Sequence, residues 1–157
     1  MVTDEICCEL IDGKKWQGKT IQWKDKPFVK DSYFALFYMP QGVEKKIVKW
    51  VNELLARKLL PEDGMILWRN EGLFGGEILI TTKKDAPDLP IEKISGKFFT
   101  MFFEGKSYSD AGKWYKAFDK ETAKKGLKIK EMMMWYTICP ACMKKFGKVQ
   151  GVLFGRI

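Results

Sequence analysis

The sequence predicts an α+β fold made of two β-α-β-β units, with an antiparallel sheet and two helices packed on one of its faces. The main observation is an internal repeat: aromatic residues from Phe34, an amphipathic run and Trp68 recur in the same order between Phe99 and Trp135. The copies begin 65 positions apart and end 67 positions apart. A nearly constant offset is the signature of a duplicated unit. Helices would hide one sheet face, and we expect a ligand groove between the two halves.

The composition suits one domain with one core. The chain has 157 residues, of which 46% are hydrophobic and 14% aromatic, so we predict a single domain over residues 1–157. No apolar run approaches the roughly 20 residues that a membrane helix needs. The first residues also lack the charged and apolar regions of a secretory signal. We therefore predict a cytoplasmic protein with no membrane partner.

The basic residues restrict the partners. The net charge is +8, but only three of the 28 basic residues are arginine. Arginine is preferred for reading base edges, so we expect no sequence-specific nucleic-acid partner. The chain also has no histidine, which removes the commonest general base and the commonest zinc and haem ligand. Any chemistry must use carboxylates, thiols, lysines or tyrosines, and we predict no cofactor.

The first repeat is predicted over about residues 20–82, after a loose lead-in at 1–15. Residues 20–23 favour a short strand that ends before Pro27. Residues 33–39 are apolar throughout and aromatic-rich, which predicts a buried strand.

A helix and a hairpin complete the first repeat. Apolar residues recur at helical spacing before Pro61, at Val43, Ile47, Trp50, Val51, Leu54 and Leu55. Strands are expected over 65–69 and 77–82, joined by a turn. Residues 83–90 contain two prolines and two aspartates, which predicts a linker between the repeats.

The second repeat is predicted over about residues 94–157. A strand over 97–103 precedes Ser107, which lies three positions before an aspartate and suits a helix cap. One helical face then carries Tyr108, Ala111, Trp114, Tyr115, Phe118 and Thr122. Long strands are expected over 128–138 and 149–157.

The strand over 128–138 carries the candidate site. Because side chains alternate along a strand, one face carries Glu131, Met133, Trp135 and Thr137. Matching Trp68 to Trp135 places Ile66 and Trp68 on the equivalent face of the first repeat. A carboxylate among aromatic and thioether groups is suited to a planar, hydrophobic cation. The alternative is that Glu131 pairs with a lysine at a sheet edge and the aromatic residues are ordinary core.

Several pieces of the chain carry a family resemblance: Lys97–Phe103, Gly105 with Tyr108, Trp114-Tyr115, Lys130–Met133 and Gly151–Ile157. Over about residues 20–157 the chain resembles the GyrI-like small-molecule-binding domain, the effector-binding domain of multidrug-responsive transcription activators, with a SOUL/GyrI-like fold. The resemblance implies that a strand glutamate meets cationic ligands at the pocket centre, and Glu131 matches that position. The family's Gly-x-Tyr turn is stretched here, and its acidic turn is replaced by a cysteine-bearing loop.

The resemblance implies ligand sensing, sequestration or, in a subset, hydrolysis. We predict a stand-alone module that binds planar, hydrophobic, cationic small molecules; a homodimer is left open. The predicted ligand-binding residues are Glu131, Trp135, Met133, Trp68, Ile66 and Tyr108. The alternative is a hydrolase of reactive small molecules, with Glu131 as general base and Tyr108 or Tyr136 as proton donor. Whether the protein is an enzyme stays open at this point.

The cysteine-bearing loop gives a second alternative, a thiol redox or metal-binding protein acting through Cys139 and Cys142. Pro140 suits a first helical position, with Cys139 as the cap of a short helix, and a helix start lowers a thiol pKa. Zinc usually takes four ligands, but the remaining cysteines, Cys7 and Cys8, are adjacent and awkward for one tetrahedral site. We therefore assign no metal ligands, and an inert or oxidised thiol pair remains a further possibility.

Overall fold

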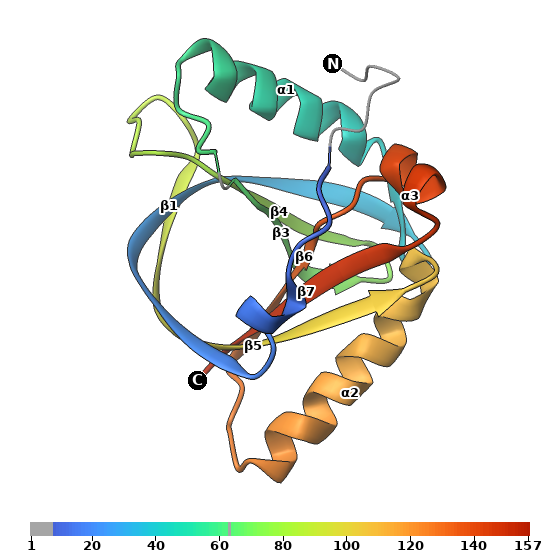
Figure 1. The fold of residues 1–157 in the computed structure, drawn as a ribbon. Helices are drawn as coiled ribbons and strands as arrows, with labels where there is room; N and C mark the ends of the chain where they lie inside the picture. Colours follow the sequence, from blue (N-terminus) through green and yellow to red (C-terminus); the bar gives the residue numbers. More distant parts are fainter. Residues whose placement is uncertain (1–7, 63) are drawn as a thin grey trace. The chain divides into compact units, whose positions relative to one another are not determined.

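The computed structural model describes residues 8–62 and 64–157 (Figure 1). The chain forms two compact units: a terminal unit of residues 8–22 and 96–157, and a central unit of residues Trp23–Ser95. Each unit places antiparallel strands against a helix, and in each the main elements follow the order strand, helix, strand, strand. The predicted α+β class with antiparallel strands is therefore confirmed.

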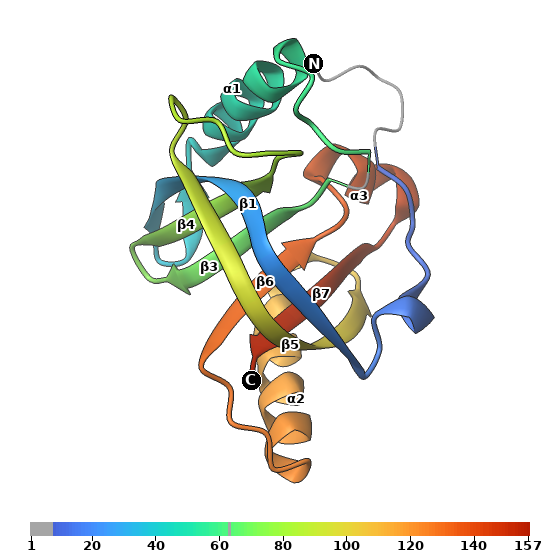
Figure 2. The same cartoon turned by 90° about the vertical axis from the view of Figure 1, so that its left-hand side faces the viewer.

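The central unit contains five elements. They are β1 (Lys19–Leu36, whose first residues belong to the terminal unit), β2 (Met39–Gln41), α1 (Val43–Ala56), β3 (Ile66–Gly72) and β4 (Gly75–Thr81). The strands lie in the order β2-β1-β4-β3, and every neighbouring pair is antiparallel. Figure 2 shows β1 as one long, curved strand.

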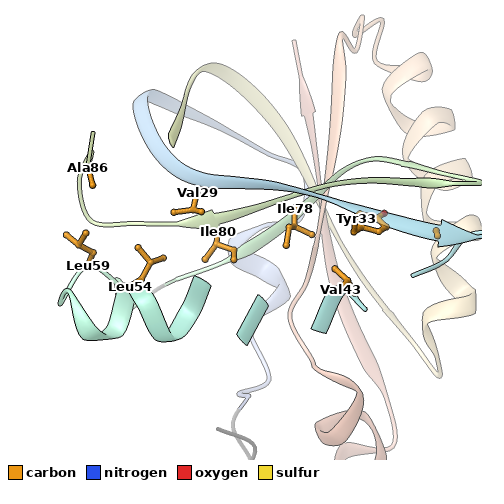
Figure 3. Packing of buried hydrophobic residues seen from close by; sticks show 9 residues of the cluster. Val29, Tyr33, Val43, Leu54, Leu59, Ile78, Ile80 and Ala86 are labelled. Carbon is orange, nitrogen blue, oxygen red and sulfur yellow. The ribbon is translucent and has the colours of Figure 1, made fainter. Parts of the chain in front are cut away.

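The core of the central unit lies between its sheet and α1. Figure 3 shows Val29, Ile78 and Ile80 of the strands facing Leu54 of α1 and Leu59 after it. Burying each such side chain contributes about 1.5–3 kcal/mol, which explains why the apolar face of α1 is held against the strands. The helix ends at Ala56, before the predicted proline stop, because Lys58, just after the C-cap residue Arg57, adopts a left-handed conformation with a φ of 58°.

The terminal unit contains the remaining elements. They are η1 (Gly13–Lys15), β5 (Ile91–Gly105, whose first residues belong to the central unit), η2 (Tyr108–Asp110), α2 (Ala111–Lys124), β6 (Glu131–Tyr136), α3 (Pro140–Phe146) and β7 (Val149–Arg156). Strand β7 lies between β5 and β6 and is antiparallel to both. The predicted short helix after Cys139 is confirmed as α3.

Two glycines of β7 let α2 pack closely on the terminal sheet. A Cβ atom at Gly151 would lie 2.7 Å from the Trp114 ring, and one at Gly155 would lie 2.7 Å from the Phe118 ring. Both rings also pack on strand β5, where Trp114 stacks on Phe103 at 5.8 Å between centroids. The side of the sheet that carries Gly151 and Gly155 is therefore the side covered by α2.

Two strand predictions for the first repeat are wrong. Strand β1 continues through Pro27, so the expected break is absent from this part of the chain. The predicted buried strand over 33–39 instead ends at Leu36, and Phe34 is 54% exposed. The physical reason is alternation: Tyr33 and Ala35 point into the core under α1, which leaves their neighbours on the other side of the strand.

The hairpin between β1 and β2 holds two aromatic residues in a conformation that suits other residue types. Leu36 pairs with Met39, so Phe37 and Tyr38 form a two-residue turn, with φ values of 48° and 69°. Such a turn favours Asn-Gly, and Tyr38 is 68% exposed, so its ring contributes little burial.

We expect the double substitution Phe37→Asn, Tyr38→Gly to raise the free energy of unfolding by about 1 kcal/mol, because it relieves two strained positions. Urea unfolding measures the change. The control is Phe74→Asn, which removes an exposed aromatic residue from the neighbouring loop. An equal gain in the control would show that surface polarity, rather than the turn conformation, is responsible.

Within residues 8–62 and 64–157, every helix is too short or too polar to cross a membrane.

Candidate functional site

Strand β6 carries three of the predicted site residues, and it places them on one side of the sheet, as the sequence indicates. Its register with β7 pairs Glu131 with Arg156, Met133 with Phe154 and Trp135 with Val152. The intervening β6 residues pair with Gly151, Leu153 and Gly155, on the side covered by α2. Glu131, Met133 and Trp135 therefore lie on the opposite side. We call this side the Glu131 face; it consists of Glu131, Met133, Trp135, Val152, Phe154 and Arg156.

The charged end of the Glu131 face is an ion pair. Arg156 Nη1 lies 3.4 Å from Glu131 Oε2, and the Glu131 side chain keeps 23% of its surface exposed. The Arg156 guanidinium also lies over the Phe98 ring, 5.8 Å from its centroid. The expected alternative partner of Glu131 was a lysine, but the structure gives it an arginine. A carboxylate and a planar guanidinium thus meet at the edge of an apolar surface.

The other end of the Glu131 face is covered by Trp16. Its ring centroid lies 5.6 Å from those of both Trp135 and Phe154, in edge-on geometry. Met133 and Phe154 are fully buried. The apolar part of the face is therefore packed, with Trp16 as its outer ring.

The segment that carries Trp16 is held by hydrogen bonds to the terminal sheet. The Thr100 hydroxyl donates to the Trp16 carbonyl at 2.6 Å, and the Phe102 amide donates to Gln17 Oε1 at 2.9 Å. Further back, the Ile11 amide donates to Gln150 Oε1 at 2.9 Å. The prediction of a loose lead-in is therefore wrong for residues 8–15; residues 1–7 lie outside the described part of the chain. We call residues 8–17 the lead-in segment.

Ile66 and Trp68 do not lie on the surface that the sequence analysis gave them. They pair with Ile80 and Ile78 of β4 and pack against the core under α1. The Trp68 ring contacts Tyr33 edge-on at 5.1 Å. The match of Trp68 to Trp135 is one residue out of step, and a one-residue slip exchanges the two faces of a strand.

Tyr108 is also separated from Glu131. Its hydroxyl donates to the Ile138 carbonyl, and its ring packs edge-on against Tyr136 at 5.5 Å. Tyr136 lies on the α2 side of β6, five residues from Glu131, which is about 17 Å along a strand. The prediction of either tyrosine as a proton donor beside Glu131 is therefore not supported by this arrangement.

The central unit contains a charged cluster that was not expected from the sequence. Arg69 Nε lies 3.2 Å from Glu77 Oε1, and Arg69 Nη2 lies 2.9 Å from Glu92 Oε1, with a second, closer contact from Nη1 to Glu92. Lys30 Nζ lies within 3.7 Å of both carboxylates. The Arg69 side chain is only 10% exposed. The sequence offered one indication of this cluster: Arg69, one of only three arginines, follows Trp68 on a predicted strand.

The cluster holds its carboxylates in the charged form. Hydrogen bonds from Arg69 lower the pKa of Glu77 and of Glu92 below the usual range for glutamate, against the opposing effect of burial. The same contacts raise the pKa of Arg69, with the hydrogen bond to Glu92 as the largest cause. Such a cluster of paired charges is suited to a structural role, because carboxylates with a lowered pKa are weak bases.

A third thiol, that of Cys8, lies close to the two thiols of the cysteine-bearing loop. The Sγ atoms of Cys8, Cys139 and Cys142 all lie within 4.8 Å of one another. Cys142 is buried, and the other two are partly buried. Burial raises the pKa of the Cys8 thiol well above its ordinary value. The sequence analysis set Cys8 aside because of its neighbour Cys7, which lies outside the described residues.

The fold resembles solved structures at low sequence identity. The crystal structure of the EcmrR C-terminal domain matches with a TM-score of 0.66 and 8% identity, over 90% of this chain and 96% of that one. EcmrR in a cryo-EM structure of its DNA complex gives a TM-score of 0.65 at 8% identity, and the match covers 90% of this chain and 57% of that one. These matches support the fold that the GyrI-like resemblance predicted.

The sequence itself gives a different family from the one the resemblance named. No curated protein sequence matches the chain. A family model described as "Bacterial hydrolase" matches residues 1–157, the whole of the sequence, and the protein therefore belongs to the bacterial hydrolase family.

Proposed function

We propose that this protein hydrolyses a flat, hydrophobic small molecule at the Glu131 face. The observation that carries the proposal is the Glu131–Arg156 pair, 3.4 Å apart and partly exposed, at the charged end of the Glu131 face. It places a candidate base and a candidate oxyanion-stabilising cation on the same side of the sheet as the partly buried Trp16 and Trp135 rings. Membership of the bacterial hydrolase family favours turnover over binding alone.

The two charged groups would have complementary roles. The Glu131 carboxylate would accept a proton from a water molecule while the water oxygen forms a bond to the electrophilic carbon of the substrate. For an ester, the carbonyl oxygen gains negative charge, which the Arg156 guanidinium would stabilise. The carbon–oxygen bond to the leaving group then breaks, and the proton held by Glu131 passes to that group. The partly buried Trp16 and Trp135 rings, farther along the same face, would orient the apolar body of an extended substrate.

Glu131 is a better candidate base than the carboxylates of the central unit. Glu77 and Glu92 have lowered pKa values and share Arg69 through close hydrogen bonds. A lowered pKa reduces the tendency of a carboxylate to accept a proton in the transition state. Glu131 lies at the charged end of its face, and its 3.4 Å contact with Arg156 is longer than the contacts of Arg69 with Glu77 Oε1 and Glu92 Oε1.

The test uses 4-nitrophenyl butyrate as an activated ester and an aryl epoxide as a second electrophile. We expect Glu131→Gln to lower kcat/KM by at least about 100-fold, the usual contribution of a general base. Arg156→Met should lower it by a similar factor, the usual cost of losing one oxyanion-stabilising group. Release of nitrophenolate and of diol measures the two rates.

The control is Glu121→Gln on α2. Glu121 also pairs with a basic residue, Lys125 at 3.9 Å, but lies away from the Glu131 face. It should leave kcat/KM unchanged. Equal losses in Glu121→Gln and Glu131→Gln would show a general effect on the fold and would contradict the assignment of Glu131.

A second candidate function is binding of a small molecule without turnover. The GyrI-like resemblance implied this function, and it fits the fold that the chain shares with the EcmrR C-terminal domain. In this case Glu131 would attract a planar cation. Ethidium and the neutral dye Nile red separate the two functions. Tight binding of ethidium that is lost in Glu131→Gln, with Nile red binding retained and neither electrophile hydrolysed, would favour the binding module.

A further inference from the structure

We propose that Cys8, Cys139 and Cys142 form a binding site for a soft divalent metal ion, with Zn²⁺ as the ion that fits best. The site lies within the terminal unit and is independent of the hydrolase proposal. Its basis is the convergence of three thiols: all three Sγ atoms lie within 4.8 Å of one another. A Cys-x-x-Cys pair alone is a weak signal, but a third cysteine from the lead-in segment makes it a ligand set.

The spacing of the sulfur atoms suits a metal ion. Three atoms with mutual separations of 4.8 Å or less all lie within about 2.8 Å of a common point, and a Zn–S bond is about 2.3 Å long. Each sulfur therefore needs to move by only about half an ångström to ligate one ion. Three thiolates leave one position of a tetrahedral ion for water or another ligand.

Local structure holds two of the ligands on one turn. Cys139 is the residue before α3, and Cys142 lies in the first turn of the helix. Pro140 fixes the backbone at the start, and the Met143 amide donates to the Cys139 carbonyl at 2.8 Å. The short helix therefore sets the positions of both thiols.

The third ligand is brought to this turn from the other end of the chain. The Cys139 amide donates to Cys8 Sγ at 3.3 Å, across 131 positions of sequence. This hydrogen bond holds Cys8 Sγ beside the turn that carries the other two thiols.

Thiolate ligands also select the type of ion. Soft sulfur donors favour Zn²⁺ and its heavier analogue Cd²⁺ over Mg²⁺ or Ca²⁺, which prefer oxygen. Because Cys8 precedes Trp16 in the lead-in segment, a bound ion would also hold that segment on the terminal sheet. Metal binding would then stabilise the folded state.

The experiment uses the full chain, reduced and freed of metal with a chelator. Co²⁺ is titrated in and followed by its sulfur-to-cobalt charge-transfer absorption, and Zn²⁺ then displaces it. We expect one ion per chain, a cobalt spectrum typical of thiolate ligands, and a higher Tm with Zn²⁺ but not with Mg²⁺. Each of Cys8→Ser, Cys139→Ser and Cys142→Ser should weaken Zn²⁺ binding by more than about tenfold, because losing a ligand costs at least as much as losing a group that orients one.

The control is Glu9→Gln, which removes the exposed carboxylate next to Cys8 and should leave Zn²⁺ affinity unchanged. The cobalt spectrum of the unaltered protein decides the question even where a serine variant fails to fold. Absence of the thiolate absorption would overturn the proposal. It would also be overturned by serine variants that fold and bind Zn²⁺ as tightly as the unaltered chain, or by a Cys139–Cys142 disulfide that forms in air despite excess Zn²⁺, which would indicate a redox pair.

Discussion

Replacing Arg69 with methionine is expected to lower the free energy of unfolding by about 3 kcal/mol. The substitution keeps most of the side-chain volume but leaves Glu77 and Glu92 without the guanidinium that joins them. Removing one partner of a buried ion pair typically costs about 3–5 kcal/mol. The lower end applies here, because both carboxylates keep some exposure and Lys30 remains nearby. Urea unfolding of the two proteins measures the difference.

The chain offers a matched control in Arg57→Met. Arg57 also joins two carboxylates, those of Glu53 and Asp88, at 2.8 Å and 2.7 Å. Its side chain is 34% exposed, against 10% for Arg69. Water screens an exposed ion pair, which contributes little to stability, so this variant should be nearly neutral. Similar losses in both variants would contradict the idea that burial determines the cost.

The loss in Arg69→Met should depend on pH. The pKa values of Glu77 and Glu92 are lower in the folded protein than in the unfolded chain, mainly because of Arg69. Their contribution to stability is therefore present above the unfolded-state pKa of glutamate, about 4.3, and disappears as the pH falls through the folded-state values. The difference between the two proteins should be largest near neutral pH and shrink in acid. A difference that stays constant down to pH 3 would contradict the electrostatic explanation.

A triple variant separates the cost of an unpaired charge from the value of the intact cluster. Arg69→Met, Glu77→Leu and Glu92→Met together replace the charged groups with apolar ones, a change that is often neutral or stabilising for buried pairs. We expect the triple variant to recover most of the stability lost in Arg69→Met. If the triple variant does not recover this stability, the intact charged cluster makes a net favourable contribution to the free energy of unfolding.

Local pattern predicted much of the fold, because each repeat is built from short-range periodicities. The period of two placed Glu131, Met133 and Trp135 on one side of β6, as the register with β7 confirms. Helical spacing located α1 and α2. Both patterns need only a few adjacent residues, so they are visible in the sequence.

The same periodicity explains the main error. The alignment of Trp68 with Trp135 is out of step by an odd number of residues, and an odd shift exchanges the two faces of a strand. Aligning Trp68 with Trp135 therefore turned Trp68 away from the core that it actually joins. It also hid Arg69, whose side of β3 carries the charged cluster.

The remaining features depend on contacts between distant parts of the chain. Trp16 meets Trp135, Cys8 meets Cys139, and Gln17 meets Phe102. Neither a periodic pattern nor a short motif records such pairs, and the lead-in segment has too little regular structure to be recognised alone. The covering of the Glu131 face and the third thiol could therefore not be predicted from the sequence.

Removing the Trp16 ring is also expected to lower the stability of the protein substantially. We expect Trp16→Ala to lower the free energy of unfolding by about 3 kcal/mol, the lower end for loss of a large aromatic ring, because Trp16 is only partly buried. It also removes the edge-on contacts to Trp135 and Phe154. Trp16→Phe, which keeps a ring, should lose less.

The same substitution tests whether the lead-in segment covers the apolar end of the Glu131 face. Without the Trp16 ring, Trp135 gains exposed apolar surface, so Trp16→Ala should bind Nile red more strongly than the unaltered protein. The matched control is Trp23→Ala in the central unit, since Trp23 is also partly buried and its ring lies 5.6 Å from that of Phe28. It should lose stability without gaining dye binding. If both variants gain dye binding equally, general loosening of the fold explains the effect. A gain confined to Trp16→Ala means that Trp16 controls how much aromatic surface is exposed at the apolar end of the Glu131 face.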